Sequence, residues 1–225
     1  LMLVLIEKNL LITNIKFSFI DKVFELKNFS YFFTIFCFIA FLNALNMFDG
    51  VNGQSAIYSI ILLLLLVKSY QTNFEYVSII IISLFIFLLY NFTNKMFLGD
   101  SGISILSYII ATQYISSYNE NYIKYVDEIF LYFAIPGYEL IRLTIQRIIL
   151  GKNPLEADTN HMHHYLQKYF SNHITVIIIL ILYIFPIILY QLGVKILICL
   201  LLSLIFYICT FLSIYFYEKF YSPKK

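Results

Sequence analysis

The sequence predicts an all-α, polytopic integral membrane protein with about seven transmembrane helices and a short extracytoplasmic β-hairpin near its amino terminus. Its 225 residues are 61% hydrophobic and only 12% charged, whereas soluble domains are about 45–50% apolar and about 25% charged. The apolar residues form long runs close to the roughly 20 residues that cross about 30 Å of hydrocarbon. Backbone groups find no partners in lipid, so we expect these runs to be helices.

The first 29 residues precede the long apolar runs. Residues 1–6 are apolar but too short to span, and we expect them to end a helix that begins upstream. Alternatively, the native start is Met2. In residues 9–24 the side chains alternate between two faces, with Leu11 and Ile15 on one and Ile12 and Asn14 on the other. This pattern predicts a strand or hairpin outside the bilayer.

The predicted spans lie between residues 30 and 217, and the whole chain is expected to form a single membrane domain. They are residues 30–47, 55–69, 74–90, 101–116, 129–149, 174–191 and 194–217. Pro136 should kink the fifth helix. The longest polar insert, residues 151–172, is read as a cytoplasmic loop. The three cysteines lie inside apolar runs without CxxC spacing, which favours buried thiols over a disulfide framework or metal site.

Alternation of the spans puts three polar clusters on one side of the membrane: residues 43–53, 94–102 and 151–166. Lysines and arginines gather in the loops of that side, which favours a cytoplasmic position, although four lysines before residue 30 count against it. A net charge of +2 gives no reason to expect nucleic acid as a partner.

The first cluster, NALNMFDGVNG, places Asn43, Asn46 and Asp49 three residues apart, so that they would share one face of a helix. Gly50 and Gly53 follow, where the backbone could turn or approach a ligand closely. Polar groups at the mouth of a membrane helix are costly, which makes them candidates for function. The alternative is a polar contact between helices or a solvated helix end.

The second cluster, NKMFLGDSG, places Asp100 and Ser101 where we expect the N-cap of the fourth helix. A helix amino terminus favours phosphate, and a neighbouring carboxylate can hold Mg²⁺ that bridges to the phosphate. The alternative is an ordinary capped helix between Gly99 and Gly102.

The third cluster contains His161, His163 and His164, three of the four histidines in the chain. Zinc is disfavoured by the spacing and by the lack of a nearby cysteine, whereas imidazoles can also donate hydrogen bonds to phosphate. Asp158 could cap or orient this segment, and a merely solvated loop is the alternative. Upstream, Glu139 and Arg142 are i, i+3 neighbours that we expect to neutralise each other. Together the clusters suit a magnesium-bound phosphate substrate and phosphoryl transfer.

These motifs carry a resemblance to a known family. Residues 43–53, Asn91 with KMFLGDSG, and the HMHH loop after Pro154 and Asp158 resemble the polyprenyl-phosphate N-acetylhexosamine-1-phosphate transferases of glycosyl transferase family 4. The resemblance runs from about residue 30 to residue 170. The HxHH form is more similar to the undecaprenyl-phosphate N-acetylglucosamine-1-phosphate transferase branch than to the phospho-MurNAc-pentapeptide translocases.

The resemblance implies that a UDP-N-acetylhexosamine gives its sugar 1-phosphate to a polyprenyl (undecaprenyl) phosphate, with Mg²⁺ as cofactor and UMP as the other product. It implies a multi-pass protein of the bacterial inner membrane with cytoplasmic active-site loops. Such a reaction starts lipid-linked envelope glycans such as lipopolysaccharide or peptidoglycan. A homodimer is among the assemblies considered.

By the resemblance, Asp100 is the magnesium ligand, Phe97 lies near the uracil, and Asn46 and Asp49 line the nucleotide-sugar pocket. The expected catalytic residues are Asp49, Asp100, His163 and His164, and the expected substrate-binding residues are Asn43, Asn46, Asn91, Lys95, Phe97, Arg142 and His161.

The chain departs from the family at Asn52, Thr159 and Glu139, where an acidic residue, a basic residue and an aspartate are usual. The family's paired aspartates, on an earlier cytoplasmic loop, would lie upstream of Leu1. An inactive or truncated remnant that binds a partner is therefore one alternative. A membrane transporter is another, although transport sites usually lie near the midplane. CDP-alcohol phosphatidyltransferases would need further aspartates between Gly50 and Asp100, which the sequence lacks.

Overall fold

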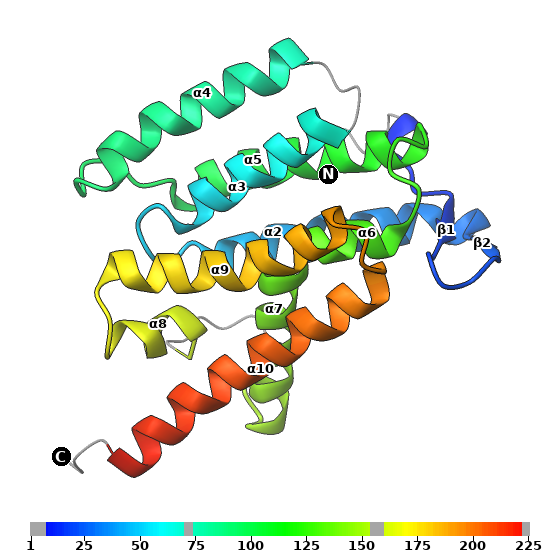
Figure 1. Ribbon diagram of the computed structural model, residues 1–225. Coiled ribbons are helices and arrows are strands. Elements are labelled where there is room, and N and C mark those ends of the chain that lie inside the picture. Colours follow the sequence, from blue (N-terminus) through cyan, green and yellow to red (C-terminus); the bar gives the residue numbers. More distant parts are fainter. Residues whose placement is uncertain (1–7, 70–73, 154–159, 222–225) are drawn as a thin grey trace. The chain divides into compact units, whose positions relative to one another are not determined.

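The computed structural model describes residues 8–69, 74–153 and 160–221 (Figure 1). The chain divides into two compact units. The first unit is Leu1–Phe133 and the second is Ala134–Lys225. Each unit is described by itself below. The single membrane domain expected from the sequence stays a prediction.

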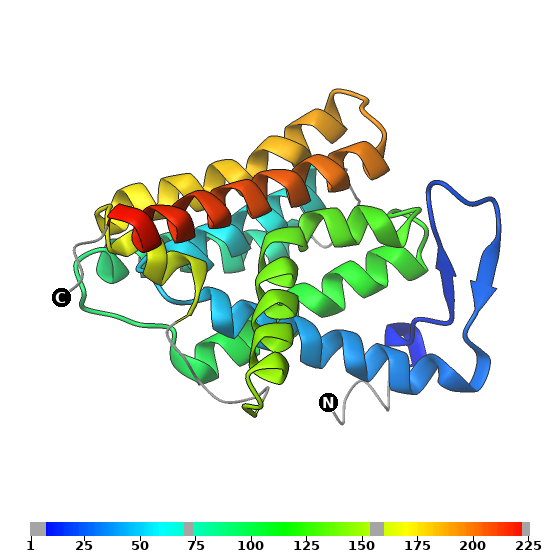
Figure 2. The same cartoon turned by 90° about the horizontal axis from the view of Figure 1, so that it is seen from below.

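A small antiparallel hairpin occupies one end of the first unit (Figure 2). Strand β1 (Asn14–Lys16) pairs with β2 (Val23–Glu25), with Asn14 opposite Glu25. The short 3-10 helices η1 (Lys8–Leu10) and η2 (Lys27–Phe29) flank it. The Tyr118 hydroxyl accepts a hydrogen bond from the Lys16 amide at 3.0 Å, and the Asp127 carboxylate accepts one from the Ser18 amide at 2.9 Å. The alternating residues 9–24 thus form paired strands in part, and their side of the membrane stays a prediction.

The helices of the first unit are α2 (Ser30–Phe48), α3 (Gln54–Ser69), α4 (Phe74–Asn91), α5 (Gly99–Asn119) and α6 (Val126–Tyr132). Helix α2 packs on α5, and α3 packs on α4 and α5. Leu45, Tyr58 and Ile110 are fully buried in this core. The Tyr114 hydroxyl donates to the Leu62 carbonyl at 3.0 Å, which joins α5 to α3. Helices α2 and α4 both run toward the end of the unit at which α5 begins, so the loops that follow α2 and α4 lie at that same end (Figure 1).

The second unit contains α7 (Ala134–Ile149), α8 (Met162–Gln167), α9 (Asn172–Gln191) and α10 (Ile196–Tyr221). Helices α9 and α10 form a helical hairpin whose turn includes Gly193 at φ 92°. Helix α10 also packs on α7 and α8. The Tyr138 hydroxyl on α7 lies 2.9 Å from the Ser203 hydroxyl on α10, a buried polar contact within this packing.

Among the described residues, four helices are long and apolar enough to cross a membrane: Lys27–Phe48, Phe74–Asn91, Asn172–Gln191 and Ile196–Tyr217. Gln54–Lys68 is apolar but shorter. Large apolar side chains such as Ile79, Leu89 and Ile205 are exposed on these helices, as lipid-facing side chains are. The protein is therefore an all-α membrane protein, while the expected number of seven spans stays a prediction.

The fifth predicted span, residues 129–149, is interrupted just before Pro136, the residue expected to kink it. Helix α6 ends at Tyr132 and α7 begins at Ala134, so Pro136 lies in the first turn of α7. Proline has no N–H to donate to the carbonyl four residues earlier and its ring clashes there. That carbonyl, on Tyr132, instead accepts a hydrogen bond from the Tyr58 hydroxyl at 3.2 Å.

Candidate functional site

Two of the three polar clusters meet at one end of the first unit, where the side chain of Asn91 joins them. Its Oδ1 accepts a hydrogen bond from the Gly53 amide at 2.6 Å, and its Nδ2 donates to the Met96 carbonyl at 2.8 Å. A second contact between the loops, Asn52 Nδ2 to Asn94 Oδ1, measures 2.5 Å. Asn91 is 6% exposed. Its observed contacts are with backbone, so it shapes the site, and direct contact with a substrate stays a prediction.

Gly53 is required by this junction. Its φ is 85°, a backbone region that residues with a Cβ rarely adopt. A Cβ at this position would lie 2.6 Å from the ring of Phe92. The glycine therefore permits both the turn into α3 and the close approach of the second loop.

Asp49 is held by the start of α3. Helix α2 ends at Phe48, and Asp49 has the non-helical angles φ −84° and ψ 56°. The expected common helical face therefore applies to Asn43 and Asn46 but not to Asp49. The Ser55 hydroxyl donates a hydrogen bond to the half-buried Asp49 carboxylate. Burial raises the pKa of Asp49 above its ordinary value, and the hydrogen bond from Ser55 opposes that rise.

Asp100 and Ser101 lie in the first turn of α5, and not at the N-cap as expected. The N-cap is Leu98, and Gly99 turns the chain with φ 60°. The helix starts earlier than predicted because the Gly102 amide bonds to the Leu98 carbonyl at 3.2 Å. Asp100 is exposed, so its carboxylate is accessible at the positive end of a helix dipole.

Asp100 offers a carboxylate of the kind that binds magnesium. The described residues contain no group of three or more His, Cys, Asp or Glu side chains that could form a metal site. Magnesium, however, usually binds through one or two carboxylates and completes its shell with substrate phosphates and water. An exposed carboxylate such as Asp100 fits that mode.

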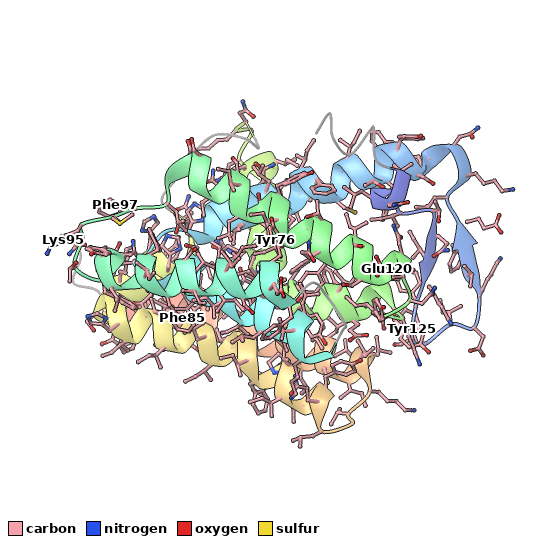
Figure 3. All side chains as sticks on the ribbon, turned by 90° about the horizontal axis from the view of Figure 1, so that it is seen from above. Tyr76, Phe85, Lys95, Phe97, Glu120 and Tyr125 are labelled. Atoms are coloured by element: carbon pink, nitrogen blue, oxygen red, sulfur yellow. The ribbon has the colours of Figure 1, made fainter. Side chains whose placement is uncertain are left out.

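The remaining predicted residues of the first unit differ in accessibility. Asn46 is exposed and Asn43 is half-buried, one helical turn apart. Lys95 and Phe97 are exposed on the loop between α4 and α5 (Figure 3), and Phe97 is 67% exposed. Figure 3 also places Glu120 and Tyr125 at the far end of α5. Lys95 and Phe97 are thus available to a ligand at the end where the two loops meet.

In the second unit the three predicted histidines form one cluster. The rings of His161 and His163 are stacked, with centroids 5.2 Å apart and planes 14° apart. The His164 ring lies 4.3 Å from that of His163. His161 is 8% exposed and His163 is 4% exposed, while His164 is more accessible. Burial, with smaller effects of His164 and His161, lowers the pKa of His163 to about 3. His163 is therefore a neutral imidazole near pH 7.

Glu139 and Arg142 form the ion pair expected from their spacing. Arg142 Nη2 lies 2.7 Å from Glu139 Oε1, and Arg142 Nε lies 3.2 Å from Oε2. Arg142 also donates to the Asn160 carbonyl at 2.6 Å and to Gln146 Oε1 at 3.1 Å. These contacts use most of the hydrogen-bond donors of the Arg142 guanidinium, so its observed role is to hold the neighbouring backbone and side chains in place. Substrate binding by Arg142 stays a prediction.

Sequence reasoning missed the contacts that several residues make in these sites: Asn52 with Asn94, Gly53 beside the Phe92 ring, Ser55 with Asp49, and Tyr207 with Glu139. Ser55 stands six residues after Asp49 at the start of a predicted helix, where a hydroxyl that bonds back to the preceding loop is common. Tyr207 is one of many aromatics in an apolar run and gave no signal. Pro154 and Asp158, which precede the histidines in the motif, and the family departure at Thr159 lie outside the described residues.

Comparison with known proteins gives the following similarities. The family model described as glycosyl transferase family 4 matches residues 1–118. A probable undecaprenyl-phosphate N-acetylglucosaminyl 1-phosphate transferase of Bacillus subtilis is 28% identical over 163 residues, which are 69% of this chain and 45% of that protein. An undecaprenyl-phosphate alpha-N-acetylglucosaminyl 1-phosphate transferase of Thermotoga maritima is 28% identical over 137 residues, 60% of this chain and 43% of that protein.

The protein of the same name from Escherichia coli O157:H7 is 23% identical over 172 residues, 71% of this chain and 47% of that protein. The chain thus spans less than half the length of these relatives. No solved structure matches it significantly.

Proposed function

The chain belongs to glycosyl transferase family 4, and from this membership we propose that it takes part in transferring N-acetylhexosamine 1-phosphate from a UDP-sugar to a polyprenyl phosphate, with release of UMP. Relatives named undecaprenyl-phosphate N-acetylglucosaminyl 1-phosphate transferases support the acceptor and the sugar class. The four apolar helices support a membrane location for the reaction. The inner membrane and cytoplasmic loops are part of the proposal, favoured by the distribution of lysine and arginine.

The observation that carries the proposal is the meeting of the two loops at one end of the first unit. Asn91 joins them by hydrogen bonds to both backbones, so Asp49 and Asp100 belong to loops that are fixed to each other. To bind a nucleotide-sugar diphosphate, a protein needs a carboxylate that holds the metal and further polar groups close together on a surface that water reaches. The transporter alternative fits less well, because transport sites tend to lie at the midplane on broken helices.

Asp100 is the residue we propose to hold Mg²⁺, and Asp49 belongs to the other loop at the same end of the first unit. The ion, when bound, would offset negative charge on the diphosphate and on the departing UMP. Asp49, whose position is fixed by Ser55, has a raised pKa and can hold or release a proton near the reacting phosphate.

Phe97, Lys95 and His163 each have a separate role in the proposed binding of the substrate. The exposed ring of Phe97 offers a stacking surface to a nucleobase, and Lys95 offers a positive charge to phosphate. A neutral imidazole such as His163 donates one hydrogen bond to a phosphate oxygen without adding a buried charge.

The test is release of UMP from UDP-N-acetylglucosamine by the purified protein in detergent with undecaprenyl phosphate and Mg²⁺. We expect Asp100→Asn to lower the rate about 100-fold or more, as removal of a group that stabilises developing charge does. Asp21→Asn is the matched control, because Asp21 is an exposed aspartate in the segment between β1 and β2 and should leave the rate unchanged. Near-normal turnover by Asp100→Asn would overturn the magnesium assignment.

A further inference from the structure

We propose that Tyr207, on the carboxyl-terminal helix α10, is a positioning residue that holds the histidine segment, residues 161–164, through the buried carboxylate of Glu139. The proposal deepens the proposed function, because it rests on that segment's contact with substrate phosphates. Tyr207 lies outside residues 1–118, which match the family model, and outside the stretch that carries the sequence motifs.

The first step is the contact between Glu139 and the histidine segment. Glu139 on α7 is 4% exposed, and its Oε1 accepts a hydrogen bond from the Met162 amide at 2.7 Å. Met162 is the first residue of α8, directly after His161 and before His163. The same Oε1 lies 3.9 Å from His161 Nδ1. One carboxylate oxygen thus fixes the backbone between two of the three histidines.

The second step is the contact between Tyr207 and Glu139. The Tyr207 hydroxyl donates a hydrogen bond to Glu139 Oε2 and accepts one from Arg142 Nε at 3.0 Å. Tyr207 is 3% exposed, so water does not compete for these bonds. Both oxygens of the Glu139 carboxylate are therefore engaged, Oε1 toward the histidine segment and Oε2 toward α10.

The third step is the backbone on the other side of His161. Arg142 donates to the Asn160 carbonyl at 2.6 Å, while its guanidinium lies 4.3 Å from the centre of the Phe211 ring. Phe211 also makes an edge contact with Tyr165 of α8, with ring centroids 5.7 Å apart. Phe211 follows Tyr207 by four residues, so both side chains come from one face of α10.

The histidine segment is consequently fixed at the amide that follows His161 and at the carbonyl that precedes it. Both contacts run through the Glu139–Arg142 pair to α10. Removing the Tyr207 hydroxyl leaves a buried carboxylate oxygen with fewer donors, and such a loss is costly when the partner is charged. We expect the segment to open more often, which would expose the histidine rings and displace them from the substrate.

The experiment compares the full chain with Tyr207→Phe and with Tyr215→Phe, all carrying His173→Gln so that only the three clustered histidines remain. Tyr215 is the matched control, because it is an exposed tyrosine on the same helix. Carbethoxylation of histidine by diethyl pyrocarbonate, followed by absorbance at neutral pH, reports how often the rings are accessible. UMP release is measured on the same samples, and circular dichroism confirms that the helices are intact.

We expect Tyr207→Phe to carbethoxylate about tenfold faster than the parent and to release UMP about tenfold more slowly, with Tyr215→Phe like the parent. Unchanged histidine reactivity in Tyr207→Phe would overturn the proposal whatever the activity. Faster carbethoxylation with undiminished UMP release would overturn the positioning role. If the parent itself releases no UMP, the proposed function fails, and histidine reactivity alone then decides whether Tyr207 holds the segment.

Discussion

Acidification should destabilise this protein through one buried imidazole, His163. Burial and the neighbouring His164 and His161 lower its pKa from 6.5 to about 3. The folded state therefore binds a proton less readily than the unfolded state. Its contribution to stability is complete above pH 6.5 and is lost progressively as the pH falls toward 3.

The size of the effect follows from the interval between the two pKa values. At pH 5 the His163 imidazole is protonated in the unfolded state but not in the folded state, and pH 5 lies 1.5 pH units below the unfolded pKa of 6.5. Each unit is worth about 1.4 kcal/mol, so the free energy of unfolding should fall by about 2 kcal/mol between pH 7.5 and pH 5. His163 is 4% exposed, so solvent screens this effect little.

The assay is denaturant unfolding in detergent at several pH values, followed by circular dichroism. His163→Asn, which cannot titrate, should lose about 2 kcal/mol less than the parent over that range. His173→Asn is the control, because His173 is exposed and its replacement should leave the pH dependence unchanged. Parallel pH dependences for the parent and His163→Asn would refute the reasoning, as would an NMR titration of His163 near 6.5.

Two further predictions concern the junction of the two loops, and a third concerns Asp49. Gly53→Ala should lower the free energy of unfolding by about 2 kcal/mol, because alanine is strained at φ 85° and its Cβ meets the Phe92 ring; thermal unfolding measures this, and an unchanged midpoint would contradict the assigned geometry. Asn91→Ala should cost about 1–3 kcal/mol, because the buried Gly53 amide loses its acceptor, and amide hydrogen exchange at Gly53 should accelerate. Ser55→Ala should raise the pKa of Asp49 further, because the hydrogen bond that lowers it is lost; the acid limb of the pH–rate profile should move to higher pH, and an unmoved limb would separate Asp49 from the reaction.

Much of this arrangement could be predicted from the sequence because hydropathy and spacing are local signals. Apolar runs located the helices, and alternation of their direction placed Asp49 and Asp100 at one end of the first unit. Contacts between residues far apart in sequence carry no such signal. The bond from Tyr207 to Glu139 crosses 68 positions, and nothing distinguishes this tyrosine from its neighbours in an apolar run.

Helix ends were the other source of error. Asp49 lies just beyond the end of α2, and Asp100 lies inside α5 instead of capping it. Glycine with a positive φ at Gly99 lets the helix start within the motif, a choice that the sequence pattern alone leaves open.

The side-chain amide of Asn91 both accepts and donates a hydrogen bond, and this limits which amino acids can replace it. Aspartate has the same shape but lacks the N–H that reaches the Met96 carbonyl, and leucine lacks both polar atoms. Glutamine keeps both polar atoms but is longer by one methylene group, and Asn91 is only 6% exposed, so the longer side chain has little room. A library of all twenty amino acids, selected for folded protein, should therefore return asparagine nearly alone.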